Sequence, residues 1–371
     1  MQVLTFAVRP NLSYAVLDAG GSVALVGAVA AAFALPALLV ALPTGHAVDR
    51  VGERPALVVG SVALLGACLL AVLAKDSILL LVVATVIIGC GHLLSVVGDQ
   101  ALIANLSTNR SLESRFGLYA FAASVGQVVG PLVLALPGGD AATPPIAAVF
   151  GVCAAVSAVL LLLSVALASS DARAESIRAS LRSATGSLLR LPGIPRAILA
   201  SSLVLTSIDL FLAYLPALGQ ERGFGTAVVS AMLVVRSLTS MLSRLFIVQL
   251  ISIAGRRRLL VMTLAISAVT LLLMPFPLPV SAFLVLSALY GFVIGTCQPI
   301  TMAWVSELAP SGMRGLAMSL RVAGNRVGQT AVPVALGPFA VLGGAGGVLA
   351  ITGGALLVAA WASRGIGRTD T

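Results

Sequence analysis

Long runs of residues without a charged side chain constrain the fold of this chain more than any other sequence feature. The run from Leu259 to Ser306 alone is long enough for two membrane-spanning helices. A span needs about 20 predominantly apolar residues, because each backbone N–H and C=O must find a hydrogen-bond partner without water. Only 9% of the residues are charged, against roughly a quarter in a soluble domain. The sequence therefore excludes a soluble protein and predicts an all-α membrane protein.

Twelve transmembrane helices are predicted. The run from Leu259 to Ser306 gives two of them, because Pro275, Pro277 and Pro279 mark a turn in its middle. Five helices come from other charge-free runs, at 19–48, 55–74, 77–98, 116–139 and 141–170. Three come from runs that carry charges, at 197–218, 226–253 and 315–340. The last two lie at the ends of the chain, at 3–17 and 343–360. The first helix is short and no basic segment precedes it, so we expect it to be truncated at its start.

The basic residues give the predicted orientation and the domains. Most of the 22 lysines and arginines fall in loops on one side, which the positive-inside rule assigns to the cytoplasm. We expect a multi-pass cell-membrane protein with both termini cytoplasmic. This topology accounts for the net charge of +9 without a nucleic-acid partner. The longest loop divides the chain into an N-terminal six-helix bundle (1–168), a cytoplasmic linker (169–196) and a C-terminal six-helix bundle (197–371).

An internal repeat relates the two predicted bundles, with equivalent positions roughly 200 residues apart. The matched positions are Arg9 with Asp209, Tyr14 with Tyr214, His92 with Gln298 and, in the segments GQVVGP and GQTAVP, Gln127 with Gln329. Duplicated halves are typical of secondary transporters, which bind substrate near the middle of the membrane between the repeats. The repeat therefore predicts two pseudo-symmetric bundles.

The segment GHAVDRVGERP, between the helices predicted at 19–48 and 55–74, resembles the signature of the major facilitator superfamily. Gly45, Asp49, Arg50, Gly52 and Arg54 match that signature. A second, degenerate copy, VQLISIAGRRR, follows the helix predicted at 226–253. The resemblance implies the fold of this superfamily and secondary transport by alternating access.

The helix predicted at 116–139 carries a second resemblance. Gly126, Gly130 and Pro131 are similar to a motif of drug and proton antiporters within the same superfamily. The paired glycines that usually follow are replaced by Leu134 and Ala135, so the match is partial. Small residues let helices approach closely, and proline bends a helix. The resemblance implies a role in gating, and ordinary helix packing is the alternative.

Arg9 and Asp209 are the most informative charges within the predicted spans. A charge inside the bilayer is costly and therefore favours a function or a partner. The two residues are equivalent in the repeat and lie at similar depths below the external ends of their helices. We hypothesise that they form an ion pair that closes the external side, and that Asp209 exchanges a proton when the pair separates. A permanent structural salt bridge is the alternative.

Other polar residues of the predicted spans are candidates for the wall of a substrate cavity. They are Tyr14, Tyr214, His92, Gln298, Arg236, Arg321, Arg326, Gln127 and Gln329. Cationic walls favour anionic or neutral polar substrates by Coulomb's law. The alternative for the arginines is hydrogen bonding to backbone carbonyls between helices, and for His92 it is packing.

The signature segment and the turn that follows the uncharged run from Leu259 to Ser306 are expected to form a cytoplasmic gate. Its residues are Gly45, Asp49, Arg50, Gly52, Arg54, Glu307 and Arg314. A static loop that only connects helices is the alternative for the signature segment.

The sequence contains no nucleotide-binding loop, no nucleophile with a neighbouring base and no metal-type cluster. It therefore predicts neither an enzyme nor a cofactor. The predicted function is proton-coupled efflux of a small organic molecule by a monomer in the lipid bilayer. Proton-coupled uptake of a polar or anionic metabolite, a channel or scramblase, and a non-transporting membrane sensor are the alternatives.

Overall fold

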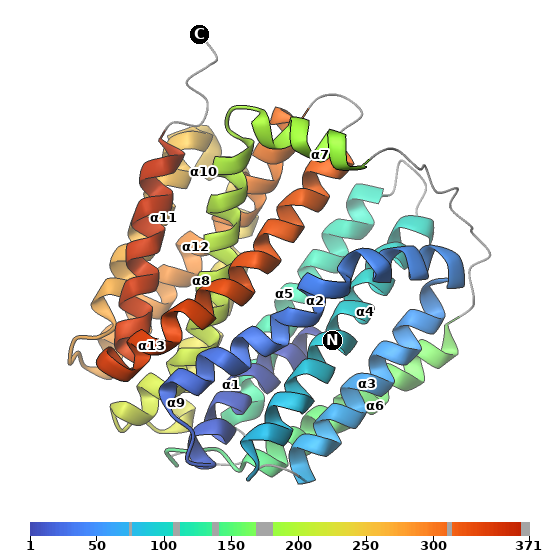
Figure 1. Ribbon diagram of the computed structural model, residues 1–371. Coiled ribbons are helices and arrows are strands. Elements are labelled where there is room, and N and C mark those ends of the chain that lie inside the picture. The colour runs from blue at the N-terminus through green and yellow to red at the C-terminus, as the bar shows by residue number, and fades with distance from the viewer. Residues whose placement is uncertain (74–75, 107–111, 136–140, 168–180, 310–313, 365–371) are drawn as a thin grey trace.

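A computed structural model describes the chain except residues 74–75, 107–111, 136–140, 168–180, 310–313 and 365–371. The described residues fold almost entirely into helices (Figure 1). The helices of the described part are α1 (Gln2–Asp18), α2 (Val23–Val51), α3 (Glu53–Leu73), α4 (Ile78–Leu106), α5 (Leu112–Ala135), α6 (Ile146–Ala166), α7 (Leu181–Arg190), α8 (Ile194–Glu221), α9 (Thr226–Leu245), α10 (Ile247–Ala254), α11 (Arg256–Leu273), α12 (Val280–Leu308) and α13 (Arg314–Ser363).

The described residues contain twelve long helical segments, as the sequence predicts. The short helix α7 lies in the predicted linker and was not predicted. The helix predicted at 226–253 is broken at Phe246, so that α10 continues beyond α9 as a separate helix. In α13, two predicted helices are joined by a sharp turn at Gly344, whose φ of 61° is accessible to glycine without steric cost.

Nine helices of the described residues are long and apolar enough to cross a membrane by length and composition. The difference from twelve has a simple origin. The first helix, α1, has only 17 residues, α11 begins with three arginines, and α13 holds two spans in one element. The twelve-helix prediction and the nine apolar helices therefore describe the same architecture.

The helices form two bundles, α1–α6 and α8–α13, which lie side by side in Figure 1. Between the bundles, α2 packs against α13, α5 against α9, and α1 against α8. The sequence repeat relates α2 to α9, and α5 to the part of α13 before Gly344, which we call its first arm; the part after Gly344 is its second arm. The repeat therefore converts the contact of α2 with α13 into the contact of α9 with α5, and the reverse. The third contact joins two repeat mates. The two bundles are therefore pseudo-symmetric, as predicted.

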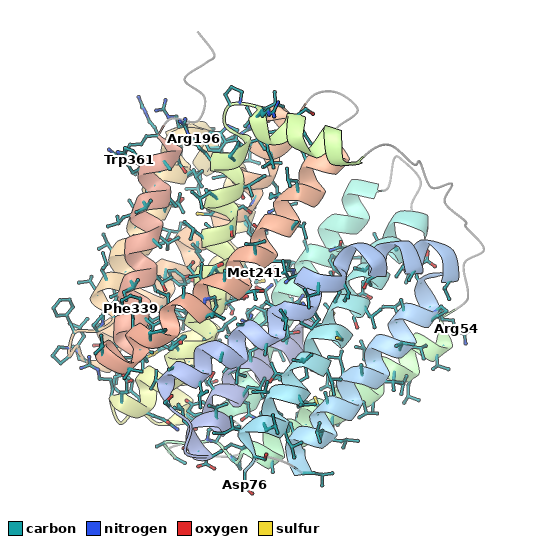
Figure 2. The ribbon with its side chains drawn as sticks, in the orientation of Figure 1. Arg54, Asp76, Arg196, Met241, Phe339 and Trp361 are labelled. Atoms are coloured by element: carbon teal, nitrogen blue, oxygen red, sulfur yellow. The ribbon has the colours of Figure 1, made fainter. Side chains whose placement is uncertain are left out.

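Two ends of the bundle need names. We call the end at which α7 lies the linker face, and the opposite end, where α1 finishes at Asp18 and α2 begins at Val23, the distal face (Figure 1). Figure 2 shows Arg196 and Trp361 at the linker face and Asp76 at the distal face.

At the distal face, the Gly344 turn is held by the end of α8. Glu221 Oε1 accepts a hydrogen bond of 2.8 Å from the backbone N–H of Ala345, the first residue after the turn. A Cβ atom on residue 344 would lie 2.7 Å from the same carboxylate oxygen. The carboxylate therefore caps the second arm of α13, because backbone N–H groups at a helix start lack partners within the helix.

Candidate functional site

The repeat-related residues Arg9 of α1 and Asp209 of α8 meet between the two bundles. Arg9 Nη1 lies 2.5 Å from Asp209 Oδ1, and the two side chains are 7% and 12% exposed. The ion pair therefore joins the bundles at a place from which nearly all solvent is excluded. The contact predicted from the repeat is present, and its role in gating stays a prediction.

A hydrogen-bond chain extends from this pair to α13. Gln329 Nε2 donates to Asp209 Oδ2 at 2.8 Å, and Arg326 Nη1 donates to Gln329 Oε1 at 3.0 Å. Both carboxylate oxygens of Asp209 are thus engaged, one by a cation and one by an amide. We call Arg9, Asp209, Gln329 and Arg326 the central cluster. It contains one anion and two cations, so its net charge is positive.

The other side of Arg9 faces aromatic residues of the first bundle. Its guanidinium lies 4.9 Å from the ring centre of Phe33, and Phe33 lies 5.3 Å from the ring of His92. His92 Nδ1 is 3.2 Å from Thr5 Oγ1. Arg9 Nη2 has no hydrogen-bond partner in the described part of the chain. His92 therefore contacts the central cluster through the packing of Phe33 between it and Arg9. In the described part of the chain, the Nη2 group of Arg9 is available to donate a hydrogen bond.

Arg236 of α9 is a second buried cation near the boundary between the bundles. It is 1% exposed, its guanidinium lies 5.6 Å from the ring centre of Phe6 in α1, and its Nη2 donates to Ser237 Oγ at 2.8 Å. Within the described residues no carboxylate lies within 4.0 Å of it, and Nε has no partner. A desolvated cation without a counter-charge is costly and favours an anionic group.

Tyr14 and Tyr214, the second repeat-related pair, are both fully buried. The phenolic oxygen of Tyr14 has no hydrogen-bond partner among the described residues. Tyr214 approaches α2 so closely that a Cβ atom on Gly27 would collide with its hydroxyl oxygen. A glycine at position 27 therefore allows α2, α8 and α13 to meet, since the same Cβ would lie 3.0 Å from the carbonyl oxygen of Pro333.

Seven predicted cavity residues lie outside the central cluster, and the three not yet described are Arg321, Gln127 and Gln298. Arg321 donates to Ser201 Oγ at 2.9 Å within the second bundle. Gln127 and Gln298 are half-buried, and no side-chain hydrogen bond of either is found in the described residues. The structure thus brings together Arg9, Asp209, Gln329 and Arg326, and leaves these three apart.

Sequence reasoning missed several hydrogen bonds between the bundles. Ser230 Oγ donates to the carbonyl oxygen of Pro131 at 2.5 Å, and Arg244 Nη1 donates to Ser124 Oγ at 3.0 Å. At the distal face, Gln220 Nε2 donates to Thr143 Oγ1 at 3.1 Å. Isolated hydroxyl and amide residues in apolar helices form no recognisable pattern, so the sequence offered no signal for these contacts.

Comparison with protein families identifies this architecture. A sequence model described as Major Facilitator Superfamily matches residues 2–235 and 197–367. The chain belongs to the Major Facilitator Superfamily. No curated protein matches it in sequence.

Solved structures of Major Facilitator Superfamily type share the fold. The chain is similar to a D-xylose-proton symporter, with 16% identity and a TM-score of 0.79 over 98% of this chain and 95% of that one. For a mutant of the nucleoside transporter NupG the values are 14%, 0.81, 99% and 98%. For an inward open conformation of the xylose transporter XylE from E. coli they are 16%, 0.76, 100% and 95%. Family membership indicates a membrane transporter rather than an enzyme, and the fold supports secondary transport.

The superfamily signature segment is folded differently from the expected loop. Gly45, Asp49 and Arg50 lie within α2, which continues to Val51, and Gly52 alone, with a φ of 94°, separates α2 from α3. The expectation of a loop was wrong because the polar residues of this segment continue the helix beyond the apolar run. Arg54 Nη2 donates to the carbonyl oxygen of Val165 at 2.7 Å, within the first bundle.

The other predicted gate contacts are described only in part. The side chains of Asp49, Arg50 and Arg314, and the surroundings of Gly45, lie outside the described residues. Glu307 of α12 forms an ion pair with Arg256 of α11. The cytoplasmic gate as a whole stays a prediction.

The antiporter-like motif of the superfamily lies where α5 packs on α1. A Cβ atom on Gly126 would lie 2.8 Å from Gln2 Cβ, and one on Gly130 would lie 2.7 Å from Phe6 Cβ. Pro131 accepts the hydrogen bond from Ser230 described above. The glycines therefore permit close packing within the first bundle, and the proline contacts the second bundle.

Proposed function

We propose that this chain is a proton-coupled secondary transporter that works by alternating access, with the central cluster as its external latch. The observation that carries the proposal is the buried Arg9–Asp209 ion pair between the bundles. Separating the bundles would leave two opposite charges without partners in a region of low dielectric. An element that holds one state closed, and whose strength depends on one carboxylate, is what coupling to protons requires.

The predicted topology assigns the linker face to the cytoplasm and the distal face to the exterior. On this assignment the structure corresponds to a state closed to the exterior. In support, the backbone N–H of Thr226 donates to the carbonyl oxygen of Ala141 at 2.8 Å, and Gln220 bonds to Thr143, both near the distal face.

Proton binding to Asp209 gives the coupling step. A protonated carboxyl group carries no charge, so it no longer attracts Arg9 as an ion pair does, and the bundles separate at lower cost. Asp209 takes its proton from the exterior while the bundles are apart on that side, and release of the proton into the cytoplasm restores the pair and keeps the exterior closed. Gln329 holds the carboxyl group in place, because it occupies the second oxygen.

Buried donors without partners support a substrate class. Arg9 Nη2, Arg236 Nε and the hydroxyl of Tyr14 are buried without partners among the described residues. Cations and hydroxyl groups that lack partners favour a small polar or anionic organic molecule over a cationic one. The antiporter-like helix motif favours efflux, and proton-coupled uptake is the alternative direction. We retain the predicted cell-membrane location, cytoplasmic termini, bundle boundaries and monomeric state within this proposal.

The experiment uses the full chain in liposomes that contain a pH-sensitive dye. A panel of sugars, nucleosides and organic acids is added with and without an imposed pH gradient. We expect one compound class to accumulate against its own gradient and to move protons in the wild type. Asp209→Asn should lose the proton movement, and Asp76→Asn, which alters an exposed carboxylate at the distal face, should keep it.

Three results of this assay contradict parts of the proposal. Full proton-coupled transport by Asp209→Asn rejects Asp209 as the proton carrier. Equilibration of a compound without accumulation supports a channel, and no movement of any compound supports a sensor. The direction of the pH gradient that drives accumulation distinguishes efflux from uptake.

A further inference from the structure

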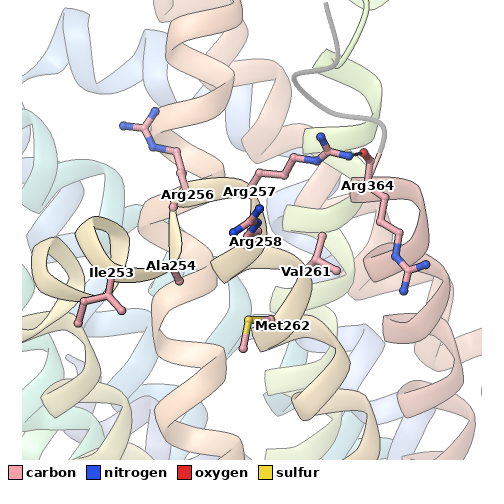
Figure 3. A pocket seen from close by; sticks show the side chains of 9 residues that line it. Ile253, Ala254, Arg256, Arg257, Arg258, Val261, Met262 and Arg364 are labelled. Carbon is pink, nitrogen blue, oxygen red and sulfur yellow. Dashed lines mark hydrogen bonds between the residues drawn. The ribbon is translucent and has the colours of Figure 1, made fainter. Parts of the chain in front are cut away.

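A pocket of about 810 Å³ lies on the linker face of the second bundle, away from the central cluster (Figure 3). It is formed where α10 meets α11, beside the end of α13. We call it the basic pocket, and its lining comprises Ile253, Ala254, Gly255, Arg256, Arg257, Arg258, Val261, Met262 and Arg364. Four of these nine residues are arginines, so the pocket is strongly cationic.

Among the described residues, most of this charge is not balanced by a carboxylate. Arg256 is paired with Glu307, and Arg257 donates a hydrogen bond to the backbone carbonyl of Arg364 (Figure 3). Among the described residues, no carboxylate lies within 4.0 Å of Arg257, Arg258 or Arg364. Arg257, Arg258 and Arg364 thus line the pocket without a carboxylate partner in the described part of the chain.

The position of these arginines in α11 adds to the positive potential. Residues 256–258 form the first turn of the helix, which contains no acidic residue. The positive end of a helix dipole favours anions and disfavours cations nearby. The repulsion between these charges is relieved when an anion from outside the chain binds among them.

The surroundings of the basic pocket are apolar. No residue of α10 is buried, and Val248 and Ile253 are 73% and 83% exposed. Met262, which lines the pocket, is also exposed. Trp361, which is 71% exposed, precedes Arg364 by one turn, and exposed tryptophans are enriched at the membrane–water boundary. An exposed tryptophan and apolar surface beside a cationic pocket are typical of the depth at which lipid headgroups lie.

We propose that the basic pocket binds the phosphodiester headgroup of an anionic phospholipid such as phosphatidylglycerol, with the acyl chains lying against α10 and Met262. Arginine recognises phosphate oxygens through several N–H groups at once. A soluble anion would satisfy the arginines but would leave the exposed residues of α10 uncovered. A zwitterionic lipid would cover α10 but would bring its own cation to the arginines. An anionic phospholipid satisfies both features.

The test measures lipid binding to the full-length protein in an uncharged detergent by native mass spectrometry. The probes are palmitoyl-oleoyl-phosphatidylglycerol, the matching phosphatidylcholine, and soluble glycerol 3-phosphate. We expect saturable binding of phosphatidylglycerol, and at least about tenfold weaker binding of the other two, because each lacks one of the two interactions.

Paired variants locate the site. Arg257→Gln with Arg258→Gln should weaken phosphatidylglycerol binding about 25-fold, since each arginine near a lipid surface contributes about fivefold. The matched control, Arg190→Gln with Arg196→Gln, removes the same charge from the linker face outside the pocket and should leave affinity within about twofold. Val248→Asn with Ile253→Asn should also weaken binding, because it removes the apolar surface of α10.

Three outcomes overturn the proposal. The first is equal phosphatidylglycerol affinity in the pocket variant and in the wild type. The second is binding of glycerol 3-phosphate as tight as that of the lipid, which makes the occupant a soluble anion. The third is unchanged affinity after the α10 substitutions. If the double arginine variant does not fold, Arg258→Gln alone, at an exposed position, should still give about a fivefold loss.

Discussion

Two regions of the molecule, the boundary between the two bundles and the linker face, each contain an arginine–carboxylate ion pair, but the two pairs have different consequences. Arg9–Asp209 and Arg256–Glu307 are both arginine–carboxylate pairs. The first joins the two bundles and its side chains are 7% and 12% exposed, whereas the second lies within one bundle and its side chains are 35% and 55% exposed. Only the first pair opposes separation of the bundles. Burial and location, rather than the kind of contact, decide which pair can oppose separation of the bundles.

The largest expected effect comes from breaking the buried pair. Arg9→Gln or Asp209→Asn should each lower the stability of the protein by about 3–5 kcal/mol, because the remaining charge stays buried without its partner. The double variant should cost less than the sum of the two, by about 2 kcal/mol or more. Unfolding of the purified protein in graded denaturant measures all three. Additive effects would show that the two residues do not interact.

A smaller effect is expected from packing at the same boundary. Gly27→Val should push α2 away from Tyr214 and Pro333 and cost about 1–3 kcal/mol. Spin labels at Asp76→Cys and Phe276→Cys, both exposed positions, should then report a longer distance between the bundles in a cysteine-free background. Gly151→Val is the control, since a Cβ there has no neighbour within 4 Å. An unchanged distance in Gly27→Val contradicts close packing of α2 on α8.

A single hydrogen bond between the bundles should contribute less again. Ser230→Ala removes the donor to the carbonyl oxygen of Pro131, and hydrogen bonds between membrane helices contribute about 0.6 kcal/mol on average and at most about 1.7. The same denaturation assay applies. Thr270→Ala is the matched control, because that hydroxyl bonds only within its own helix. A larger loss in the control than in Ser230→Ala would contradict the comparison.

The smallest effect is expected at the linker face. Glu307→Gln breaks the exposed pair with Arg256, and exposed ion pairs typically contribute about 0–1 kcal/mol. Added salt should remove most of this difference, because it screens exposed charges more than buried ones. A salt-independent loss as large as that of Asp209→Asn would show that the linker-face pair is as important as the buried one.

Much of the fold was predictable from the sequence because two signals are strong. Membrane spans require long apolar runs, and the duplicated pattern placed Arg9 and Asp209 at equivalent depths. Once the bundles pack around a pseudo-twofold axis, repeat-related polar residues of α1 and α8 are brought near that axis. The Arg9–Asp209 contact therefore followed from spacing and from the cost of buried charge.

Other features depend on packing that spacing does not encode. Gln329 reaches Asp209 because α13 packs against α8. The sequence of each membrane span, taken separately, does not show which spans are neighbours. The end of α2 could not be placed, because polar residues of the signature segment continue the helix where the apolar run stops. The break at Phe246 has no proline or glycine to mark it, and the isolated partners Ser230 and Ser124 belong to no motif.

The Glu221 cap has a mechanical consequence. One carboxylate joins the distal end of α8 to the start of the last arm of α13, which otherwise depends on a flexible glycine. In the proposed alternating-access motion, a tilt of α8 away from Arg9 would therefore carry the final arm with it. The second bundle would then move as one rigid body.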